Sequence, residues 1–349
     1  MADQQDEQPP HLAAVVPKPD SETTIAALRA EGVYDDARKV REYDEQTLAL
    51  PVTDPPQETA VLEVVEQRDP ERRAPGLDSL LLDRRWSEEA VERAPSSWAV
   101  VGDIVLVNFD ADFDDALGDD KREEVGEALL DLHGETDTVL ARGGVSGTFR
   151  EPDVEVVAGQ GDTETVHTEH GTRYALDFAS VMFSPGNKAE RARMGDVVES
   201  GERVFDMFAG IGYFTLPMAR AGANVVAVEK NPASFKYLVE NAMLNDVQGR
   251  VEPFRADCRE VEIDPKADRV VMGYYESHEY LDSALGALKS GGVVHMHETT
   301  PEDLLWDRPV SRLRDAAASH DRPVEILDRR KVKSHSEGVW HVVVDARVE

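Results

Sequence analysis

Residues 203–229 constrain the fold most, because they alternate an apolar strand, a glycine turn, a helical stretch and a second apolar strand. Between the strands stands Gly210-Ile-Gly212, and glycines at this spacing let the backbone turn tightly and approach a ligand closely. Glu229 ends the second strand 17 residues after Gly212, where a carboxylate can accept hydrogen bonds from a ribose diol. We therefore predict a nucleoside-binding site; the alternative is a helix–strand turn with an incidental surface acid.

A second acid ends the next expected strand, in Arg255-Ala-Asp257-Cys258. Asp257 is placed to read the amino group of an adenine, although an acid there is also a common helix N-cap. A dinucleotide fits less well, because Thr215 stands where the dinucleotide-binding motif has its third glycine, which leaves a pyrophosphate a poorer cradle. The pattern resembles that of class I S-adenosylmethionine-dependent transferases rather than that of nicotinamide enzymes.

From residue 190 onward the sequence shows a regular strand–helix alternation. Strands are expected at residues 203–207, 224–229, 250–256, 267–273 and 292–297, each followed by a helical stretch. Two further strands, 324–331 and 338–346, follow each other closely and are expected to pair antiparallel. The fold class is therefore α/β, a doubly wound Rossmann-like sheet that is parallel except for a terminal antiparallel strand.

The length of 349 residues predicts two or three domains. Residues 1–12 are a polar tail, and residues 13–66 a small α/β module. Residues 67–95, rich in Pro, Arg and Glu, predict a linker with one short helix. Residues 96–189, which begin with one expected strand at 98–107, predict an α+β domain, and residues 190–349 the catalytic domain.

The chain is strongly acidic, with 70 Asp and Glu against 38 Lys and Arg and a net charge of -32. The acids are dispersed, which favours adaptation to molar salt, where the Debye length is about 3 Å and net charge costs little. The alternative is that the negative charge of the chain serves to repel anions. The charge therefore does not exclude an RNA substrate, although its recognition would depend on stacking and shape.

Several classes of protein are excluded by composition. No run of 18 apolar residues occurs, so no membrane span is expected. The first ten residues are polar, which predicts no signal peptide and a cytoplasmic enzyme. Cys258 is the single cysteine, which excludes an intrachain disulfide and a cysteine-cluster metal site, and no metal is expected.

Motifs spread over most of the chain resemble the archaeal tRNA position-37 modifying enzymes, here of a haloarchaeal type. These are the guanine-N1 methyltransferase and its sister, the wybutosine-synthesis aminocarboxypropyltransferase. Besides the glycine turn, the segments that carry the resemblance are Gly32-Val-Tyr-Asp-Asp36, Gly147-Thr-Phe-Arg150, Phe183-Ser-Pro-Gly-Asn187, Glu190-Arg-Ala-Arg193, Glu229-Lys-Asn-Pro232, Asn241-Ala-Met-Leu-Asn245 and His295-Met-His-Glu298.

Two segments distinguish the sister enzymes. The methyltransferase carries Asn-Leu-Pro after its fourth strand, where an amide orients a ring nitrogen, whereas this chain has Met272-Gly-Tyr-Tyr275. The run Lys333-Ser-His-Ser-Glu-Gly-Val-Trp-His-Val-Val-Val-Asp345 also resembles the aminocarboxypropyl branch. The sulfonium of S-adenosylmethionine activates three carbons, and geometry selects the one that reacts.

The resemblance therefore implies transfer of the 3-amino-3-carboxypropyl group to C7 of 4-demethylwyosine at position 37 of tRNA(Phe), with methylthioadenosine as by-product. Guanine-N1 methylation of tRNA is the second reading. An RNA-binding scaffold with a vestigial pocket is the third, and the intact glycine turn and acids argue against it.

The resemblance also implies which residues contact S-adenosylmethionine. These are Ser184, Arg191, Glu229 and Asp257, with the backbone of Cys258 nearby, beside Gly210 and Gly212 of the turn. Arg191 has the fork geometry that holds a carboxylate, with a solvated helix cation as the alternative. Residues 187–190 also fit a capping box that would only begin a helix.

The acceptor would be a tricyclic purine in the anticodon stem-loop of a tRNA, and it would leave its stack to react. The resemblance also makes residues 13–66 a candidate for tRNA binding. The protein is expected to act as a monomer. Phe208, Tyr213, Tyr274 and Tyr275 are candidates for stacking on it, or for packing in the core. The group that removes the ring proton is unassigned, with His295, His297 and Glu298 as weak candidates. The densest run of cations, Arg329, Arg330, Lys331 and Lys333, is expected to contact phosphates or to balance nearby acids.

Overall fold

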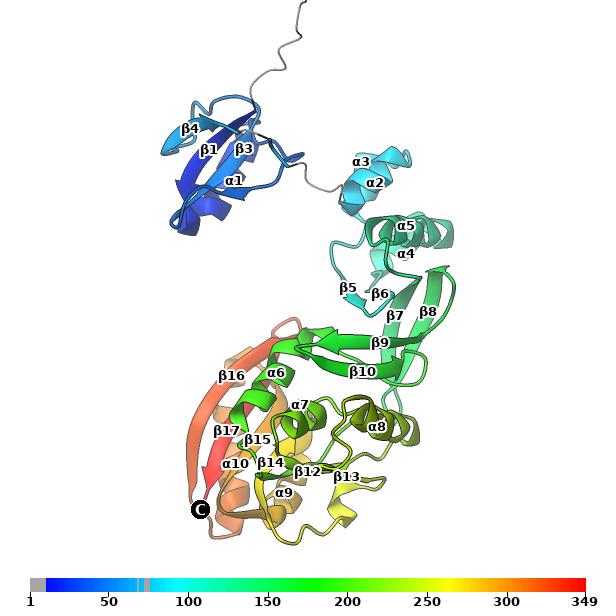
Figure 1. The fold of residues 1–349 in the computed structure, drawn as a ribbon, viewed down its shortest axis with the longest axis vertical. Coiled ribbons are helices and arrows are strands. Elements are labelled where there is room, and N and C mark those ends of the chain that lie inside the picture. The colour runs from blue at the N-terminus through cyan, green and yellow to red at the C-terminus, as the bar shows by residue number, and fades with distance from the viewer. Residues whose placement is uncertain (1–10, 68, 72–75) are drawn as a thin grey trace, which may run out of the picture. The chain divides into compact units, whose positions relative to one another are not determined.

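The computed structural model describes residues 11–67, 69–71 and 76–349. Residues 1–10 of the expected tail, and Arg68 and residues 72–75 of the expected linker, lie outside the described residues. The chain divides into two units, residues 1–91 and 92–349, and each is described by itself (Figure 1). Among the described residues no helix is both long and apolar enough to cross a bilayer.

The first unit contains an antiparallel sheet with a helix packed on it. Its strand order is β2-β3-β1-β4, from β1 (Leu12–Pro17), β2 (Arg41–Glu42), β3 (Thr47–Val52) and β4 (Glu63–Glu66). A 3-10 turn, η1 (Lys18–Asp20), leads into α1 (Ser21–Ala30). Leu28 of this helix packs against Val16 and Leu50 of the sheet, so apolar burial holds the helix to the strands.

The expected linker contains two helices rather than one. They are α2 (Leu77–Asp83) and α3 (Glu88–Glu92). The second begins because the Ser87 hydroxyl accepts a hydrogen bond from the amide of Ala90, at 3.2 Å, which satisfies a backbone donor of its first turn. The two acids that follow Ser87 also favour a helix N-terminus.

The second unit opens with a hairpin where a single strand is expected at residues 98–107. Gly102 divides the strand, because its positive φ of 60° turns the chain back, and a Cβ there would lie 1.9 Å from the Thr165 hydroxyl. The sheet order is β5-β6-β7-β8. The elements of this region are β5 (Trp98–Val101), β6 (Ile104–Val107), α4 (Ala111–Leu117), α5 (Asp119–Leu132), β7 (Thr138–Ser146), β8 (Glu151–Gly159), β9 (Glu164–Glu169) and β10 (Thr172–Asp177), the last two forming a separate hairpin.

A seven-stranded sheet follows in the order β13-β12-β11-β14-β15-β17-β16. The first five strands are parallel, and β17 runs antiparallel to both of its neighbours. The expected sheet with one reversed strand is therefore confirmed. The strands are β11 (Arg203–Asp206), β12 (Asn224–Val228), β13 (Val251–Phe254), β14 (Ala267–Met272), β15 (Leu288–Pro301), β16 (Val324–Ser336) and β17 (Val339–Val348).

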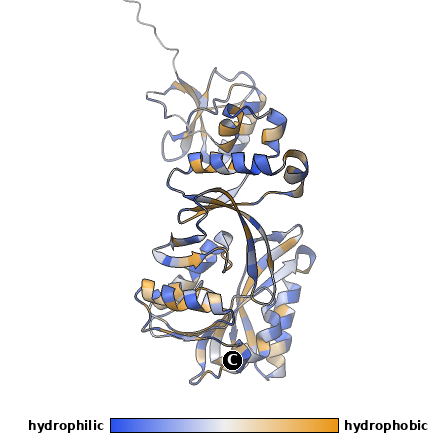
Figure 2. Cartoon of the chain, turned by 90° about the vertical axis from the view of Figure 1, so that its right-hand side faces the viewer, coloured by the Kyte–Doolittle hydropathy of each residue, from blue (hydrophilic) through white to orange (hydrophobic). Residues whose placement is uncertain are grey.

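Helices cover both faces of this sheet, because successive strand residues point to opposite sides. Val204 packs with Met194 and Leu216 on one face, whereas its neighbour Phe205 packs with Leu313 on the other. Figure 2 shows hydrophobic and hydrophilic residues alternating along the helices. They are α6 (Lys188–Val197), α7 (Thr215–Arg220), α8 (Pro232–Leu244), α9 (Leu281–Ala287) and α10 (Asp307–Ser319), with 3-10 turns η2 (Pro185–Asn187), η3 (Cys258–Glu260), η4 (Ser277–Tyr280) and η5 (Glu302–Leu304).

Candidate active site

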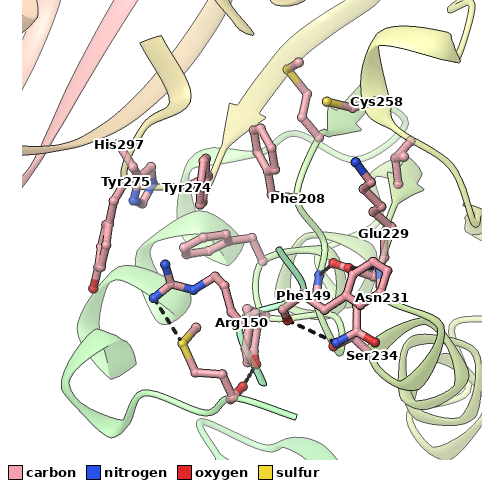
Figure 3. A pocket seen from close by; sticks show the side chains of 18 of the residues that line it. Phe149, Arg150, Phe208, Glu229, Asn231, Ser234, Cys258, Tyr274, Tyr275 and His297 are labelled. Carbon is pink, nitrogen blue, oxygen red and sulfur yellow. Dashed lines mark hydrogen bonds between the residues drawn. The ribbon is translucent and has the colours of Figure 1, made fainter. Parts of the chain in front are cut away.

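A cleft of about 700 Å³ opens at the carboxyl ends of β11, β12 and β14. Its size is that of a small-molecule site. The turn between β7 and β8, residues 147–150, forms part of its wall opposite the sheet. Figure 3 shows aromatic side chains from Phe208 and Tyr274 in the cleft, with Glu229 and Asn231 at its other end.

The glycine turn and the acid of β12 meet in this cleft, as predicted. Gly210 has a φ of 57°, and its amide donates a hydrogen bond of 2.8 Å to the Glu229 carboxylate. The other carboxylate oxygen accepts from the amide of Asn231 at 2.6 Å. Burial raises the pKa of Glu229. Gly212 does not line the cleft; its φ of 101° serves the turn, and a Cβ there would lie 2.7 Å from Leu216.

Asp257 caps a helix and also lines the cleft, while its contact with an adenine amino group stays a prediction. Its carboxylate accepts a hydrogen bond from the Arg259 amide at 3.1 Å and begins η3. The Arg259 guanidinium donates two more, at 2.9 and 2.7 Å, and these hydrogen bonds hold the pKa of Asp257 well below its usual range. Burial raises the pKa of the Cys258 thiol to about 12, so this side chain is a neutral packing group.

Arg191 is buried rather than solvated, which makes the helix-cation alternative wrong. The fork formed by its Nε and Nη2 donates to the two carboxylate oxygens of Glu169, at 2.7 and 2.8 Å. Although burial opposes it, hydrogen bonds from His167 and Arg191 lower the pKa of Glu169 to about 2. The fork that was expected to hold a ligand carboxylate is thus already paired. Nη1 donates to the carbonyl of Ser184, at 2.9 Å, so Arg191 also positions a second residue of the cleft.

Asn187 does not form the expected capping box, because its side chain makes no cap hydrogen bond. It lines the cleft instead, and its Oδ1 is buried without a partner among the described residues. An unpartnered buried acceptor is costly. Together with the two carboxylates of Glu229 and Asp257, this amide fits a ligand that carries hydroxyls and an ammonium group, as S-adenosylmethionine does.

The aromatic candidates line the cleft, and two of them, Phe208 and Tyr274, contact each other. The ring centroids of Phe208 and Tyr274 lie 5.2 Å apart, and Tyr280, which sequence reasoning missed, lies edge-on to Phe208 at 5.0 Å. The Tyr275 ring faces the guanidinium of Arg150 at 5.4 Å. The Tyr213 hydroxyl donates a hydrogen bond to the carbonyl of Met182. Tyr213 therefore fixes the wall of the cleft, and the other rings remain candidates for stacking.

Of the three weak candidates for a base, only His297 lines the cleft. Glu298, the next residue of β15, points to the opposite face of the sheet, where Arg308 and Arg312 pair with its Oε1 at 2.8 and 2.7 Å. Its candidacy was therefore wrong, because neighbouring strand residues cannot face the same side. His295 is held by the Asp345 carboxylate at 2.6 Å and does not line the cleft.

His297 pairs with a residue that sequence reasoning missed. The two facing nitrogens, His297 Nδ1 and His341 Nε2, lie 3.0 Å apart, and both side chains are buried. His341 also lines the cleft. The only signal in the sequence was its place in the run of residues 333–345, which assigns it no role.

The two histidines are expected to make the second unit less stable in acid from about pH 6.5 downward, whereas Asp206, whose pKa burial raises to about 6, acts in the opposite direction. Burial lowers the pKa of His297 to about 3 and that of His341 to about 2, from 6.5. Below pH 6.5 the unfolded chain therefore binds protons that the folded chain refuses, so each histidine removes about 1.4 kcal/mol of unfolding free energy per pH unit. Urea unfolding between about pH 6.5 and 5 measures this slope, which the double variant His297→Asn, His341→Gln should flatten. An equally steep slope in that variant would contradict the assignment.

The expected cationic run does not form one RNA-binding face. Arg330 is withdrawn into the fold, where its guanidinium pairs with Glu190 and with Asp345 at 2.7 Å. A bulge between Lys331 and Lys333 shifts the register of β16, so Lys333 lies on the same side as Arg330 and donates to the Ser184 hydroxyl at 2.5 Å. Arg330 is therefore a structural residue, which corrects its proposed role in RNA binding.

The two remaining cations of the run are exposed. The Lys331 ammonium lies 3.1 Å from Glu302 and 4.1 Å from the centre of the Trp340 ring. The Arg329 guanidinium lies 6.0 Å from the Trp306 ring. Contact of Arg329, Lys331 and Lys333 with RNA stays a prediction.

The strand order, the glycine turn and the acids at the ends of β12 and β13 define a class I S-adenosylmethionine-dependent transferase. Residues 165–327 match the family model described as TRM5/TYW2 methyltransferase domain, and residues 78–163 match the TYW2 N-terminal domain. The chain belongs to the TRM5/TYW2 family.

Relatives from both branches of the family are similar to the chain. The tRNA(Phe) (4-demethylwyosine(37)-C(7)) aminocarboxypropyltransferase of Pyrococcus horikoshii is 39% identical over 270 residues, 77% of this chain and 95% of that protein. The tRNA (guanine(37)-N(1))-methyltransferase Trm5b of Pyrococcus abyssi is 31% identical over 339 residues, 97% of this chain and 99% of that protein. The crystal structure of P. horikoshii TYW2 in complex with MeSAdo superposes with a TM-score of 0.66 at 38% identity, covering 77% of this chain and 96% of that chain.

Proposed function

We propose that this protein transfers the 3-amino-3-carboxypropyl group of S-adenosylmethionine to C7 of 4-demethylwyosine at position 37 of tRNA(Phe). The observation that carries the proposal is the 39% identity to an aminocarboxypropyltransferase over 95% of its length, against 31% to the methyltransferase. The cleft supports it, because the segment after β14 offers Gly273, Tyr274 and Tyr275 and no amide that would orient a ring nitrogen.

The donor fits the end of the cleft that holds the acids. Glu229 accepts hydrogen bonds from the ribose diol, and Asp257 accepts one from the adenine amino group. The unpartnered Oδ1 of Asn187 accepts from the ammonium of the amino-acid chain, beside Ser184 and the remaining N–H groups of Arg191. Bound S-adenosylmethionine supplies a carbon that its sulfonium activates, and these contacts choose which carbon faces the acceptor.

The acceptor fits the opposite, aromatic end. An extruded tricyclic base presents a large π-face, and Phe208, Tyr274 and Tyr275 supply rings on which it stacks. We propose that the anticodon stem-loop brings position 37 to this end of the cleft, with Arg150 and Lys333 near its phosphates. Neither cation has an acidic partner in the part of the chain that the structure describes.

Several finer features complete the proposal. The protein acts as a monomer in the cytoplasm, and its dispersed negative charge adapts it to molar salt. Residues 13–66 form a separate module that binds tRNA outside the anticodon. The match to the methyltransferase relative spans 97% of this chain, whereas the match to the aminocarboxypropyltransferase spans 77%. This difference supports a module that is shared with the methyltransferases. The division of the second unit at residue 189 into two domains also remains a proposal.

The by-product of the reaction distinguishes the two candidate activities. Incubation with S-adenosylmethionine and tRNA(Phe) that carries 4-demethylwyosine is expected to yield methylthioadenosine in step with modified tRNA. Chromatography with mass detection separates it from S-adenosylhomocysteine, the by-product of methyl transfer. Unmodified tRNA with guanine at position 37 is the matched control, and S-adenosylhomocysteine formed from it would establish the methyltransferase instead.

A further inference from the structure

Two buried imidazoles flank the acceptor end of the cleft. His297 lies on β15 and His341 on the adjacent antiparallel strand β17. Each of the two residues is 1% exposed, yet each lines the cleft. Figure 3 shows His297 beside Tyr275 and Tyr274, and the rings of His341 and Tyr275 lie 4.9 Å apart. The pair is thus built into the fold and still borders the site of reaction.

The position of the pair in the sheet separates it from the donor. The acids that bind the nucleoside end β12 and β13, on one side of β11. The histidines belong to β15 and β17, beyond β14 on the other side. Met296 is in register with Met272, so the next residues, His297 and Gly273, border the segment where an acceptor would lie.

A count of hydrogen-bonding groups shows what the pair offers to a ligand. The contact between His297 Nδ1 and His341 Nε2 uses one nitrogen of each ring. The other two, His297 Nε2 and His341 Nδ1, are buried without a partner among the described residues. In either tautomer of a neutral pair, one of these nitrogens is a bare acceptor and the other a donor. The two roles exchange when the contact proton crosses the 3.0 Å gap and the outer proton leaves one ring and is gained by the other.

The surroundings keep both rings neutral. Burial lowers both pKa values, and nearby basic side chains act in the same direction. Arg330, Arg193 and His295 do so at His297, where Asp345 opposes them, and Lys333 and His335 do so at His341, where Glu190 opposes them. A neutral pair does not repel a sulfonium donor, and it holds a free lone pair at physiological pH.

We propose that His297 and His341 together form the catalytic base that removes the proton from the acceptor carbon. This inference rests on the proposed function. The ring carbon attacks the γ-carbon of the donor, a C–C bond forms, and the C–S bond breaks with its electron pair passing to sulfur. The C–H bond at the attacked carbon then breaks, its pair restores the aromatic ring, and its proton moves to the bare imidazole nitrogen. The contact between the rings carries the charge onward to the second histidine.

A weak base is sufficient for this step. A purine carbon that bears both its hydrogen and a new substituent has lost aromaticity, so its proton is strongly acidic. The base needs a correctly placed lone pair more than a high affinity for protons. A neutral pair joined by one internal hydrogen bond provides such a lone pair on one ring and a second ring that takes up the charge, so both rings are needed.

Two matched variants remove one open nitrogen each and keep the internal contact. In His297→Asn the amide occupies the place of Nδ1 and Nε2 is lost, whereas in His341→Gln the amide occupies the place of Nε2 and Nδ1 is lost. His320→Gln is the control, because His320 is a surface residue that pairs with Asp282. Circular dichroism and calorimetric titration with S-adenosylmethionine establish that each variant folds and binds the donor as the parent chain does.

The decisive measurement is single-turnover transfer to tRNA whose acceptor carbon bears hydrogen or deuterium. The parent chain and His320→Gln should show an isotope effect near one, because proton loss follows a slower attack. In the two variants we expect transfer to fall by about 100-fold or more and the isotope effect to rise above about two, with donor affinity unchanged. Loss of rate without an isotope effect, or rates within about threefold of the parent in both variants, would overturn the inference. If the parent chain forms no methylthioadenosine, the proposed function itself fails.

Discussion

Replacing Glu229 with glutamine is expected to weaken S-adenosylmethionine binding by about 100-fold, because the two charge-assisted hydrogen bonds that we propose to the ribose diol would together contribute about 3 kcal/mol. The carboxylate is well placed for this role, since the amides of Gly210 and Asn231 hold its two oxygens at 2.8 and 2.6 Å. Glutamine keeps the shape but has only one acceptor, so one of these amides or a ribose hydroxyl loses its partner. Calorimetric titration measures the change in Kd.

Glu252→Gln is the matched control for charge. Glu252 lies exposed on β13, and among the described residues it forms an ion pair with Arg203, at 4.0 Å, so its loss should change the Kd less than twofold. Thermal unfolding without donor tests whether Glu229→Gln folds. A folded Glu229→Gln chain that binds the donor within threefold of the parent would show that the ribose is held elsewhere.

The donor end of the site was predictable because its residues are local in sequence. One strand, one glycine turn and the end of the next strand bring Gly210 and Glu229 together, and the regular alternation fixes the parallel sheet around them. The strand that ends before Asp257 follows the same rule. Short-range patterns therefore sufficed to place three of the residues that line the cleft.

Contacts between distant segments were not predictable in this way. Arg191 was correctly placed at the cleft, but its partner Glu169 comes from a hairpin of the preceding region. No spacing rule links the two, so the fork was expected to be open for a ligand. His341 was missed for the same reason, because its contact with His297 joins strands separated by a long connection.

Some residues lie on a different side of their strand than the sequence predicted. In one strand regular alternation already excludes the prediction, and in another the strand itself is irregular. Glu298 and His297 are neighbours on β15, and alternation alone excludes one of them from the cleft. In β16 the bulge after Lys331 reverses the expected alternation and brings Lys333 toward Ser184. Gly102 similarly turns an apolar run into a hairpin. Bulges and turns of this kind depend on packing that a sequence does not display.

Replacing Asp345 with asparagine is expected to lower the unfolding free energy by about 3–5 kcal/mol, because it removes a buried carboxylate that pairs with two half-buried guanidinium groups. The Asp345 carboxylate is 4% exposed and pairs with Arg330 at 2.7 Å, with Arg193 at 2.7 Å and with His295 at 2.6 Å. Asp328 provides a matched control, since it lies 3.2 Å from the same Arg330 but is 49% exposed. Asp328→Asn should therefore cost less than about 1 kcal/mol. Urea unfolding in dilute and in molar salt measures both, and we expect the large loss to persist at high salt because the pair is shielded from ions. Equal losses for the two variants would show that burial does not set the strength of this network.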